Sequence, residues 1–375
     1  MRPIQMVDLK QQYQNIKPEI EAAISQVIES AAFINGPQVQ SFANALAKYN
    51  QVKHVIPCAN GTDALQIALM ALDLQPGDEV ITPSFTFIAT TEVVALLKLT
   101  PVFVDVNPKT FCIDASAIEK AITPKTKAII PVHLYGQASN MEEIMQLASA
   151  HNLPVIEDNA QAIGGEFYFS DGSTRKTGSV GTMSTTSFFP SKNLGGYGDG
   201  GAIMTNDDEL ATILKMVANH GQSKRYYHDL VGCNSRLDSL QAAVLDVKLK
   251  YLDKYVEARR SLADRYDAAL QAHPKIITPF RVPYCKHVFH QYTLILEGVD
   301  RNKLHAYLAD LNIPSMIYYP VPAHRQKMFA QFNSSSTELP ITDWLTERVI
   351  SLPMHTEMDE EQINFITSSV LNFVN

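Results

Sequence analysis

The chain has 375 residues, of which 46% are hydrophobic and 19% are charged, a composition typical of a globular protein with a substantial core. The net charge is −8 and no run of lysine or arginine stands out, so the sequence excludes a nucleic-acid-binding surface built on positive charge. No apolar run reaches the length of a membrane span and the N-terminus lacks the apolar segment of a secretory signal, so we expect a cytoplasmic protein without a membrane partner.

The first predicted elements are two helices. Apolar residues keep to one helical face over residues 8–32, and a break at 34–37 ends that pattern. A second amphipathic pattern follows over residues 39–47. We expect this helical arm to pack on the body of the protein or on a partner chain.

A strand, a tight turn and a helix follow at residues 55–74. Residues 55–59 are predicted as a strand, and Gly61 permits a turn into the apolar helix over residues 64–74. Thr62 and Asp63 favour the start of a helix, where free N–H groups form an anion site. Ordinary helix capping is the alternative interpretation of this turn.

Short apolar strands then alternate with helices. Strands are predicted near residues 79–82, 102–105, 128–132, 155–157, 186–189 and 202–205, and helices at 115–121 and 141–151. Continuous apolar strands separated by helices predict an α/β fold with a mainly parallel central sheet flanked by helices. Ligands bind such sheets at the carboxyl ends of the strands.

The C-terminal third has a different pattern. One long helix is predicted over residues 236–270, followed by α+β elements: a strand at 290–296, helices at 302–311 and 359–372, and the apolar segment 350–354. The serine run 334–336 is predicted as a loop. We therefore predict an N-terminal arm and large α/β domain over residues 1–250 and a smaller C-terminal α+β domain over residues 251–375.

Lys192 is the first candidate for chemistry. It follows the apolar run Phe188-Phe189-Pro190, and five glycines follow it between Gly195 and Gly201. A lysine at the mouth of an apolar pocket has a lowered pKa, because burial disfavours its charged form. A neutral lysine amine can form a Schiff base with an aldehyde cofactor. A solvated surface lysine is the alternative.

Asp158 is the second candidate. It ends the apolar run at 153–156, where its carboxylate could pair with a protonated pyridine nitrogen or cap a turn. Other polar residues fall at neighbouring strand ends, at 60–62, 86–87, 133–136 and 158–161, and this grouping predicts one active site. The four cysteines have no C-x-x-C spacing, so we expect neither a metal site nor a disulfide framework.

These residues lie in recognisable motifs. The stretch Ser-Phe-Phe-Pro-Ser-Lys-Asn-Leu-Gly at 187–195, Gly-Asp-Gly-Gly at 198–201 and Glu-Asp-Asn-Ala-Gln at 157–161 resemble those of the DegT/DnrJ/EryC1/StrS family of sugar aminotransferases. That family uses pyridoxal phosphate on the fold-type I scaffold, and the resemblance covers residues from about 4 to 370. It implies that Lys192 forms the Schiff base and moves protons, that Asp158 holds the pyridine nitrogen, and that Gln161 contacts the cofactor's hydroxyl edge.

The resemblance also assigns further contacts. It implies that Phe87 stacks on the cofactor ring, with Phe85 in the core, and that the phosphate is bound by Gly61, Thr62, Ser187 and, from a neighbouring subunit, Asn234. The active site would then require a homodimer. Substrate contacts are implied for Tyr318 and His324, and Arg225 is a candidate for a nucleotide diphosphate. A structural histidine, a solvated loop and, for Asn234, a turn or helix cap are the alternatives.

The implied reaction is transamination of a nucleotide-linked keto-sugar, with L-glutamate as the amino donor. The motifs are most similar to enzymes that aminate C3 of UDP- or dTDP-linked sugars for cell-surface polysaccharide or amino-sugar biosynthesis. A sugar dehydratase on the same scaffold would have histidine in place of Lys192, and a non-catalytic regulatory protein would need no intact site. A nicotinamide-dependent dehydrogenase is disfavoured, since no G-x-G-x-x-G follows an early strand.

Overall fold

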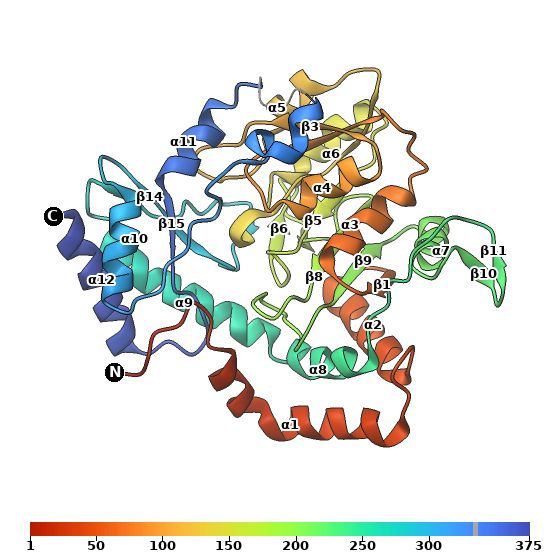
Figure 1. Ribbon diagram of the computed structural model, residues 1–375, viewed down its shortest axis with the longest axis horizontal. Helices are drawn as coiled ribbons and strands as arrows, with labels where there is room; N and C mark the ends of the chain where they lie inside the picture. Colours follow the sequence, from red (N-terminus) through yellow and green to blue (C-terminus); the bar gives the residue numbers. More distant parts are fainter. Residues whose placement is uncertain (333–336) are drawn as a thin grey trace.

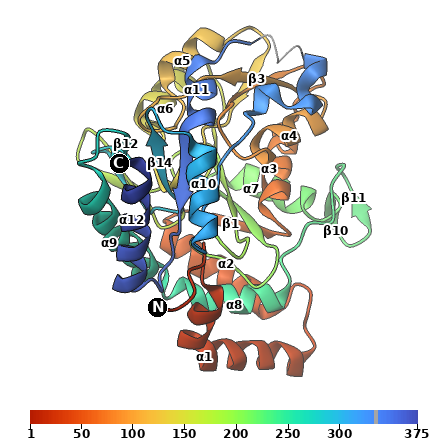
Figure 2. The same ribbon diagram turned by 60° about the vertical axis from the view of Figure 1, so that its left-hand side comes forward.

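A computed structural model describes residues 1–332 and 337–375, so the predicted serine loop at 334–336 lies outside the described residues. Figure 1 shows a broad α/β body with a smaller layer of helices and strands beside it at the left, and Figure 2 shows the same arrangement from the side. The N-terminal arm, α1 (Leu9–Ser30) and α2 (Pro37–Asn50), runs along the body next to α8 (Ser239–Leu249), as expected. No helix in the described residues is long and apolar enough to cross a membrane.

The body is built on one mixed sheet. Its strands, in spatial order, are β1 (His54–Cys58), β9 (Gly201–Thr205), β8 (Met183–Ser187), β5 (Ile156–Asp158), β4 (Thr126–Ile129), β2 (Glu79–Pro83) and β3 (Thr100–Val104). Two parallel bridges, Ile129 to Val155 and Val132 to Asp158, join the two halves. Only β9 of these strands runs against its neighbours, so the prediction of a mainly parallel sheet is confirmed.

Helices cover the sheet because its strands carry apolar residues on both faces. All five residues of β9 are buried, and so are the apolar faces of the helices packed on the sheet. These helices are α3 (Gly61–Met70), α4 (Ala89–Leu96), α5 (Ala115–Ala121), α6 (Met141–Ala150) and α7 (Asp208–Val217), with the short η1 (Leu134–Gly136) at a strand end. The predicted strand at 186–189 ends earlier, at Ser187, which leaves Phe189 53% exposed.

The single helix predicted over residues 236–270 is wrong, since the structure has two. Helix α8 ends at Leu249 and α9 spans Leu252–Leu270. Between them Lys250 and Tyr251 donate N–H groups to carbonyls only three residues back, a tighter turn that no glycine or proline marks. The apolar pattern continues across the break because both helices pack on the same body.

The C-terminal part has its own antiparallel sheet and core. Its elements are β12 (Ile276–Ile277), β14 (Tyr292–Leu296), β15 (Val349–Leu352), α10 (Arg301–Asp310), α11 (Pro340–Arg348), α12 (Glu360–Val374), η2 (Ala323–Arg325) and η3 (Lys327–Phe332). Helix α9 serves both cores: Leu252 and Val256 pack with the body, whereas Leu262 and Leu270 pack with the C-terminal sheet.

Two hairpins complete the chain. One hairpin consists of β6 (Glu166–Tyr168) and β7 (Thr174–Lys176), and β13 (Cys285–Lys286) pairs with β6. A second hairpin, β10 (Gln222–Lys224) with β11 (Tyr227–His228), projects away from the body at the right of Figure 1. Tyr226 at its tip is 78% exposed and Val231 just beyond it is 86% exposed.

Candidate active site

A cavity of about 430 Å³ opens where β1, β2, β5 and β8 end. These four strands run in the same direction, so the residues that follow them converge at one edge of the sheet. The predicted site residues that line the cavity are Gly61, Thr62, Phe87, Asp158, Gln161, Ser187, Lys192 and Tyr318. The structure therefore brings together residues that are as far apart as 257 positions in the sequence, from 61 to 318.

Asp158 is held in one orientation at the end of β5. Its Oδ2 accepts a hydrogen bond of 2.8 Å from Thr90 Oγ1, and its Oδ1 accepts one of 3.1 Å from the Ala160 N–H. Thr90 in turn lies 3.0 Å from Thr86 Oγ1, so two hydroxyls lead from the cavity to the carboxylate. Asp158 is only 5% exposed, and such a fixed carboxylate could pair with a cationic ring nitrogen.

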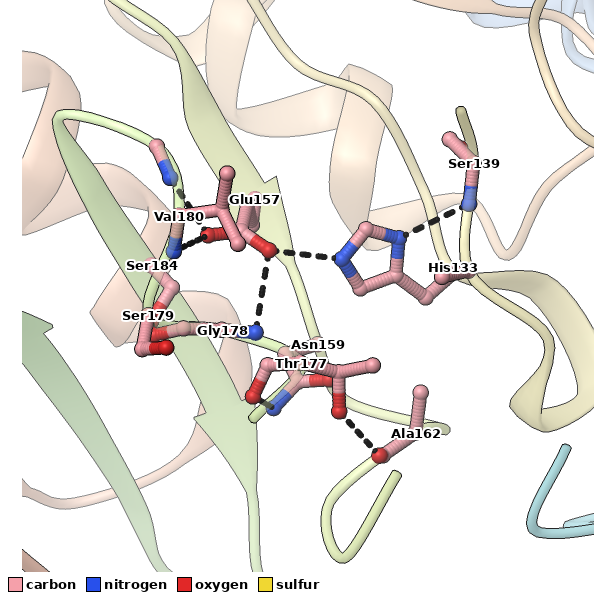
Figure 3. Close-up of polar contacts among 12 residues, drawn as sticks. His133, Ser139, Glu157, Asn159, Ala162, Thr177, Gly178, Ser179, Val180 and Ser184 are labelled. Atoms are coloured by element: carbon pink, nitrogen blue, oxygen red, sulfur yellow. Dashed lines mark hydrogen bonds and ion pairs between the residues drawn. The ribbon is translucent and has the colours of Figure 1, made fainter. Parts of the chain in front are cut away.

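Glu157, which precedes Asp158 on β5, is held by the network of polar contacts that Figure 3 shows. Its Oε1 accepts hydrogen bonds of 2.7 and 2.6 Å from the N–H groups of Val180 and Gly181. Its Oε2 accepts bonds of 2.9 Å from the Gly178 N–H and 2.8 Å from His133 Nε2. The carboxylate is fully buried and fully bonded, and it ties the loop before β8 to the end of β5.

His133 completes this network as a neutral donor. Its Nδ1 accepts a hydrogen bond of 3.2 Å from the Ser139 N–H, so its proton lies on Nε2 and faces Glu157. Burial alone would raise the pKa of Glu157, but the bonds from His133 and the backbone N–H groups hold it below its ordinary value. Glu157 therefore stays ionised although it is buried.

The loop that follows β8 presents Lys192 to the cavity. The Lys192 N–H bonds the Phe189 carbonyl at 2.8 Å, and the chain then passes so close to itself that larger residues would clash. A Cβ at Gly195 would lie 2.3 Å from the Pro190 oxygen, and one at Gly201 would lie 2.4 Å from the Asn60 oxygen. The glycines noted in the sequence are thus required by close backbone packing.

Lys192 has the electrostatic setting of a reactive amine. Burial lowers its pKa to about 8, while the negative charge of Asp158 opposes that shift. About a tenth of the amine is therefore neutral at pH 7, far more than for an ordinary lysine, and the neutral form is the one that condenses with an aldehyde. The pair Lys192 and Asp158 fits the two ends of a pyridine-ring aldehyde.

The start of α3 could bind a phosphate group. The Asn60 side chain accepts a hydrogen bond of 2.8 Å from the Asp63 N–H and so caps the helix, whose first N–H groups, those of Gly61 and Thr62, lie at the cavity. Gly61 lies against Ser187, since a Cβ at position 61 would be 2.7 Å from the Ser187 Cβ. A helix start and a serine hydroxyl thus converge at one end of the cavity.

Gln161 and Phe87 line the same cavity. The Gln161 Oε1 accepts a hydrogen bond of 2.6 Å from the Tyr135 N–H, so its amide nitrogen, 3.2 Å from the Tyr319 hydroxyl, remains the donor towards a ligand. The Phe87 ring is 53% exposed at the cavity and lies 6.2 Å from the Tyr319 ring. Phe85, expected in the core, is 1% exposed.

Three predicted residues lie outside this cavity. Arg225 is exposed on the β10–β11 hairpin, and Asn234 is exposed beyond it. His324 is buried, and its Nδ1 bonds the Ser84 hydroxyl at 2.7 Å, so it fastens η2 to the end of β2. Four further residues belong to the site but were not predicted from the sequence: Thr90, which bonds Asp158, and the cavity-lining His290, Gln291 and Tyr319. Their local sequence pattern does not distinguish them from structural residues.

A half-buried lysine with a lowered pKa, near a fixed carboxylate and a helix start on a mainly parallel sheet, defines a pyridoxal-phosphate-dependent transferase of fold type I. The chain belongs to the DegT/DnrJ/EryC1/StrS aminotransferase family, whose family model matches residues 14–371. It is therefore an aminotransferase, and pyridoxal phosphate is the cofactor of this family.

Individual relatives match over almost their whole length. A Geobacillus stearothermophilus protein named a pleiotropic regulatory protein is 45% identical over 372 residues, which are 99% of this chain and 98% of that protein. The Pseudomonas aeruginosa UDP-2-acetamido-2-deoxy-3-oxo-D-glucuronate aminotransferase is 44% identical over 369 residues, which are 98% of this chain and 100% of the relative. The crystal structure of S. venezuelae DesV in complex with a ketimine intermediate has a TM-score of 0.95 at 37% identity, over 100% of this chain and 99% of DesV.

Proposed function

We propose that this protein transfers an amino group from L-glutamate to a nucleotide-linked 3-keto-sugar, carried on UDP or dTDP, in amino-sugar or cell-surface polysaccharide biosynthesis. The observation that carries the proposal is the half-buried Lys192, which lines the cavity. Desolvation lowers its pKa to about 8, and the nearby charge of Asp158 opposes that shift. The relative that acts on a UDP-linked 3-oxo sugar supports the sugar class.

The residues of the cavity have separate roles in this proposal. When bound, pyridoxal phosphate supplies an aldehyde carbon and an electron-accepting ring. Lys192 would hold the aldehyde carbon at rest, and its Nζ would take the proton from the donor's α-carbon and return a proton to the sugar carbon. Asp158, oriented by Thr90, would keep the ring nitrogen protonated, as an ionised partner favours its cationic form.

The remaining contacts would fix the cofactor's position. Gly61, Thr62 and Ser187 lie where the phosphate would bind, and the free amide hydrogen of Gln161 would meet the ring hydroxyl. Phe87 would cover one face of the ring, since its own ring is exposed at the cavity. Tyr318, which also lines the cavity, would contact the substrate.

We propose that a second copy of the chain completes the site. Asn234 and Arg225 lie outside the cavity of their own chain, on or beyond a projecting hairpin. Tyr226 and Tyr227 on that hairpin are 78% and 58% exposed, and Val231 just beyond it is 86% exposed. Exposed apolar side chains grouped in this way are typical of a protein–protein contact. A homodimer would cover these side chains and bring Asn234 to the partner's phosphate site.

The test is a panel of UDP- and dTDP-linked keto-sugars, assayed for glutamate-dependent amination. Lys192→Ala should abolish turnover, and Lys248→Met serves as the matched control, because Lys248 is buried and also has a pKa lowered to about 8 but lies outside the cavity. Elimination of water from the sugar without amination would indicate the dehydratase. Cofactor binding with no turnover on any sugar would support the regulatory role that the Geobacillus relative's name describes.

A further inference from the structure

His290 lies in the cavity wall that the C-terminal part supplies. It precedes β14, is 6% exposed, and lines the same cavity as Lys192 and Asp158. Its Nδ1 has no hydrogen-bond partner among the described residues, and its Nε2 lies 3.5 Å from the Gln291 side-chain nitrogen. A buried imidazole nitrogen without a partner is costly, so its presence at a cavity indicates a ligand that supplies the missing hydrogen bond.

The backbone around His290 is held in an unfavourable shape. Phe289 has a φ of 46°, in the left-handed region that residues other than glycine avoid, and its N–H bonds His287 Nδ1 at 3.0 Å. Strained backbone of this kind persists only where the surroundings enforce it, and it is frequent at ligand sites. The left-handed conformation of Phe289 thus directs the next residue, His290, to the cavity.

Two further side chains fix this loop. The buried guanidinium of Arg259 donates through Nη1 to the carbonyls of Phe289, His290 and Met354, at 3.1, 3.3 and 3.0 Å. Asn193, the residue after Lys192, donates to the Val288 carbonyl at 3.1 Å. The loop that carries His290 is therefore fastened to the loop that carries the reactive lysine.

The chemistry of His290 restricts what it can bind. Burial lowers its pKa well below the ordinary value, and the positive charges of Lys192 and Arg259 lower it further, so the ring is neutral. A neutral imidazole has one donor and one acceptor nitrogen. The Gln291 amide nitrogen beside Nε2 can only donate, so Nε2 is the acceptor and the unpaired Nδ1 carries the proton. The missing partner is therefore an acceptor oxygen, and a sugar hydroxyl offers one.

We propose that His290 binds the acceptor sugar, through a hydrogen bond between its unpaired ring nitrogen and a hydroxyl next to the carbon that receives the amino group. This inference rests on the proposed sugar transamination. Lys192 must reach the reacting carbon, and the loops of the two residues are joined through Asn193, so an adjacent hydroxyl lies within the space that both side chains border.

The test separates the two halves of the reaction in the holoenzyme. Because transamination proceeds in two half-reactions, the change in cofactor absorbance can be followed with glutamate alone and with the keto-sugar alone. His290→Leu should lower kcat/KM for the sugar half-reaction about 10- to 100-fold and leave the glutamate half-reaction within about threefold. His290→Asn, whose amide can occupy the place of Nδ1, should recover part of the loss.

Calorimetry adds a readout that does not depend on turnover. The affinity of the holoenzyme for the amino-sugar nucleotide product should fall with His290→Leu, while the absorbance of the bound cofactor should not change. His355→Asn is the matched control: this imidazole is also buried with an unpartnered nitrogen and a pKa lowered to about 4, but it lies away from the cavity. It should leave both half-reactions and product affinity unchanged.

The outcomes are distinct. An equal fall in both half-reactions, or unchanged product affinity and sugar kinetics in His290→Leu, would overturn the role of His290 while leaving the proposed function intact. If the wild-type enzyme reacts with glutamate but aminates no sugar of the panel, the proposed function itself fails, and the sugar contact with it.

Discussion

Replacing Glu157 by glutamine tests whether the buried network behind Asp158 holds the site together. The four donors around the carboxylate leave an amide no favourable orientation. If the amide nitrogen replaces Oε1, it faces the N–H groups of Val180 and Gly181; if it replaces Oε2, it faces the Gly178 N–H and His133 Nε2. The other tautomer of His133 gives no relief, because a proton on Nδ1 would face the Ser139 N–H.

Two buried donors therefore lose their acceptor in Glu157→Gln. At about 1–3 kcal/mol for each unsatisfied group, the free energy of unfolding should fall by about 2–6 kcal/mol. For a chain of 375 residues the entropy of unfolding scales to a Tm shift of about 1.3 °C per kcal/mol, so we expect Tm to fall by about 3–8 °C. Differential scanning calorimetry of the wild type and the variant measures this directly.

The pH dependence gives a second measurement. Because the pKa of Glu157 in the folded protein lies below its ordinary value of 4.5, its contribution to stability is complete above that value and is lost as pH falls through the folded-state pKa. The Tm difference between wild type and Glu157→Gln should therefore narrow as pH falls from 6 towards 3.

The control is Glu166→Gln in the β6–β7 hairpin. Glu166 pairs with Lys176 at 3.0 Å near the surface, where such pairs contribute about 1 kcal/mol at most. A loss in Glu157→Gln no larger than in this control, or a Tm difference that does not change with pH, would refute the argument for the buried network.

Three further predictions concern the cavity. Lys192→Ala should remove the near-visible absorbance of the cofactor-loaded protein and stop turnover, and a coloured, active variant would contradict the assignment. Thr90→Val removes the hydroxyl that orients the Asp158 carboxylate, so kcat in steady-state kinetics should fall about 5- to 20-fold. Thr90→Ser keeps a hydroxyl at this position and should stay near the wild-type kcat. Mixing Asn234→Ala with Lys192→Ala chains should restore part of the activity through hybrid dimers; no rescue after demonstrated subunit exchange counts against a shared site.

The sequence predicted the sheet and its ligand edge well, because continuous apolar strands and intervening helices leave few alternative arrangements. Asp158 is the last residue of β5, Gly61 lies three residues after β1 and Lys192 lies five residues after β8, so local pattern alone predicted their place at the cavity. The break between α8 and α9 was missed because a tightened turn needs no special residue type.

The local sequence pattern could not predict contacts between segments that are distant in the sequence. Thr90 meets Asp158 across 68 positions of sequence, and His290 reaches the cavity from the C-terminal part, just before β14. His324 was predicted from its proline-rich turn to contact the substrate, but its buried ring forms a hydrogen bond with the Ser84 hydroxyl. A single sequence carries no signal that separates such a structural histidine from one that lines the site.

The cavity has one wall from the central sheet and another from the C-terminal part, where His290, Gln291, Tyr318 and Tyr319 originate. In the proposed function, the residues that carry the chemistry and those that would contact the sugar thus come from separate parts of the sequence. Exchanging the last ~100 codons with those of a relative would replace the wall proposed to face the sugar while retaining Lys192 and Asp158. This arrangement would allow the acceptor sugar to change while the catalytic residues stay the same.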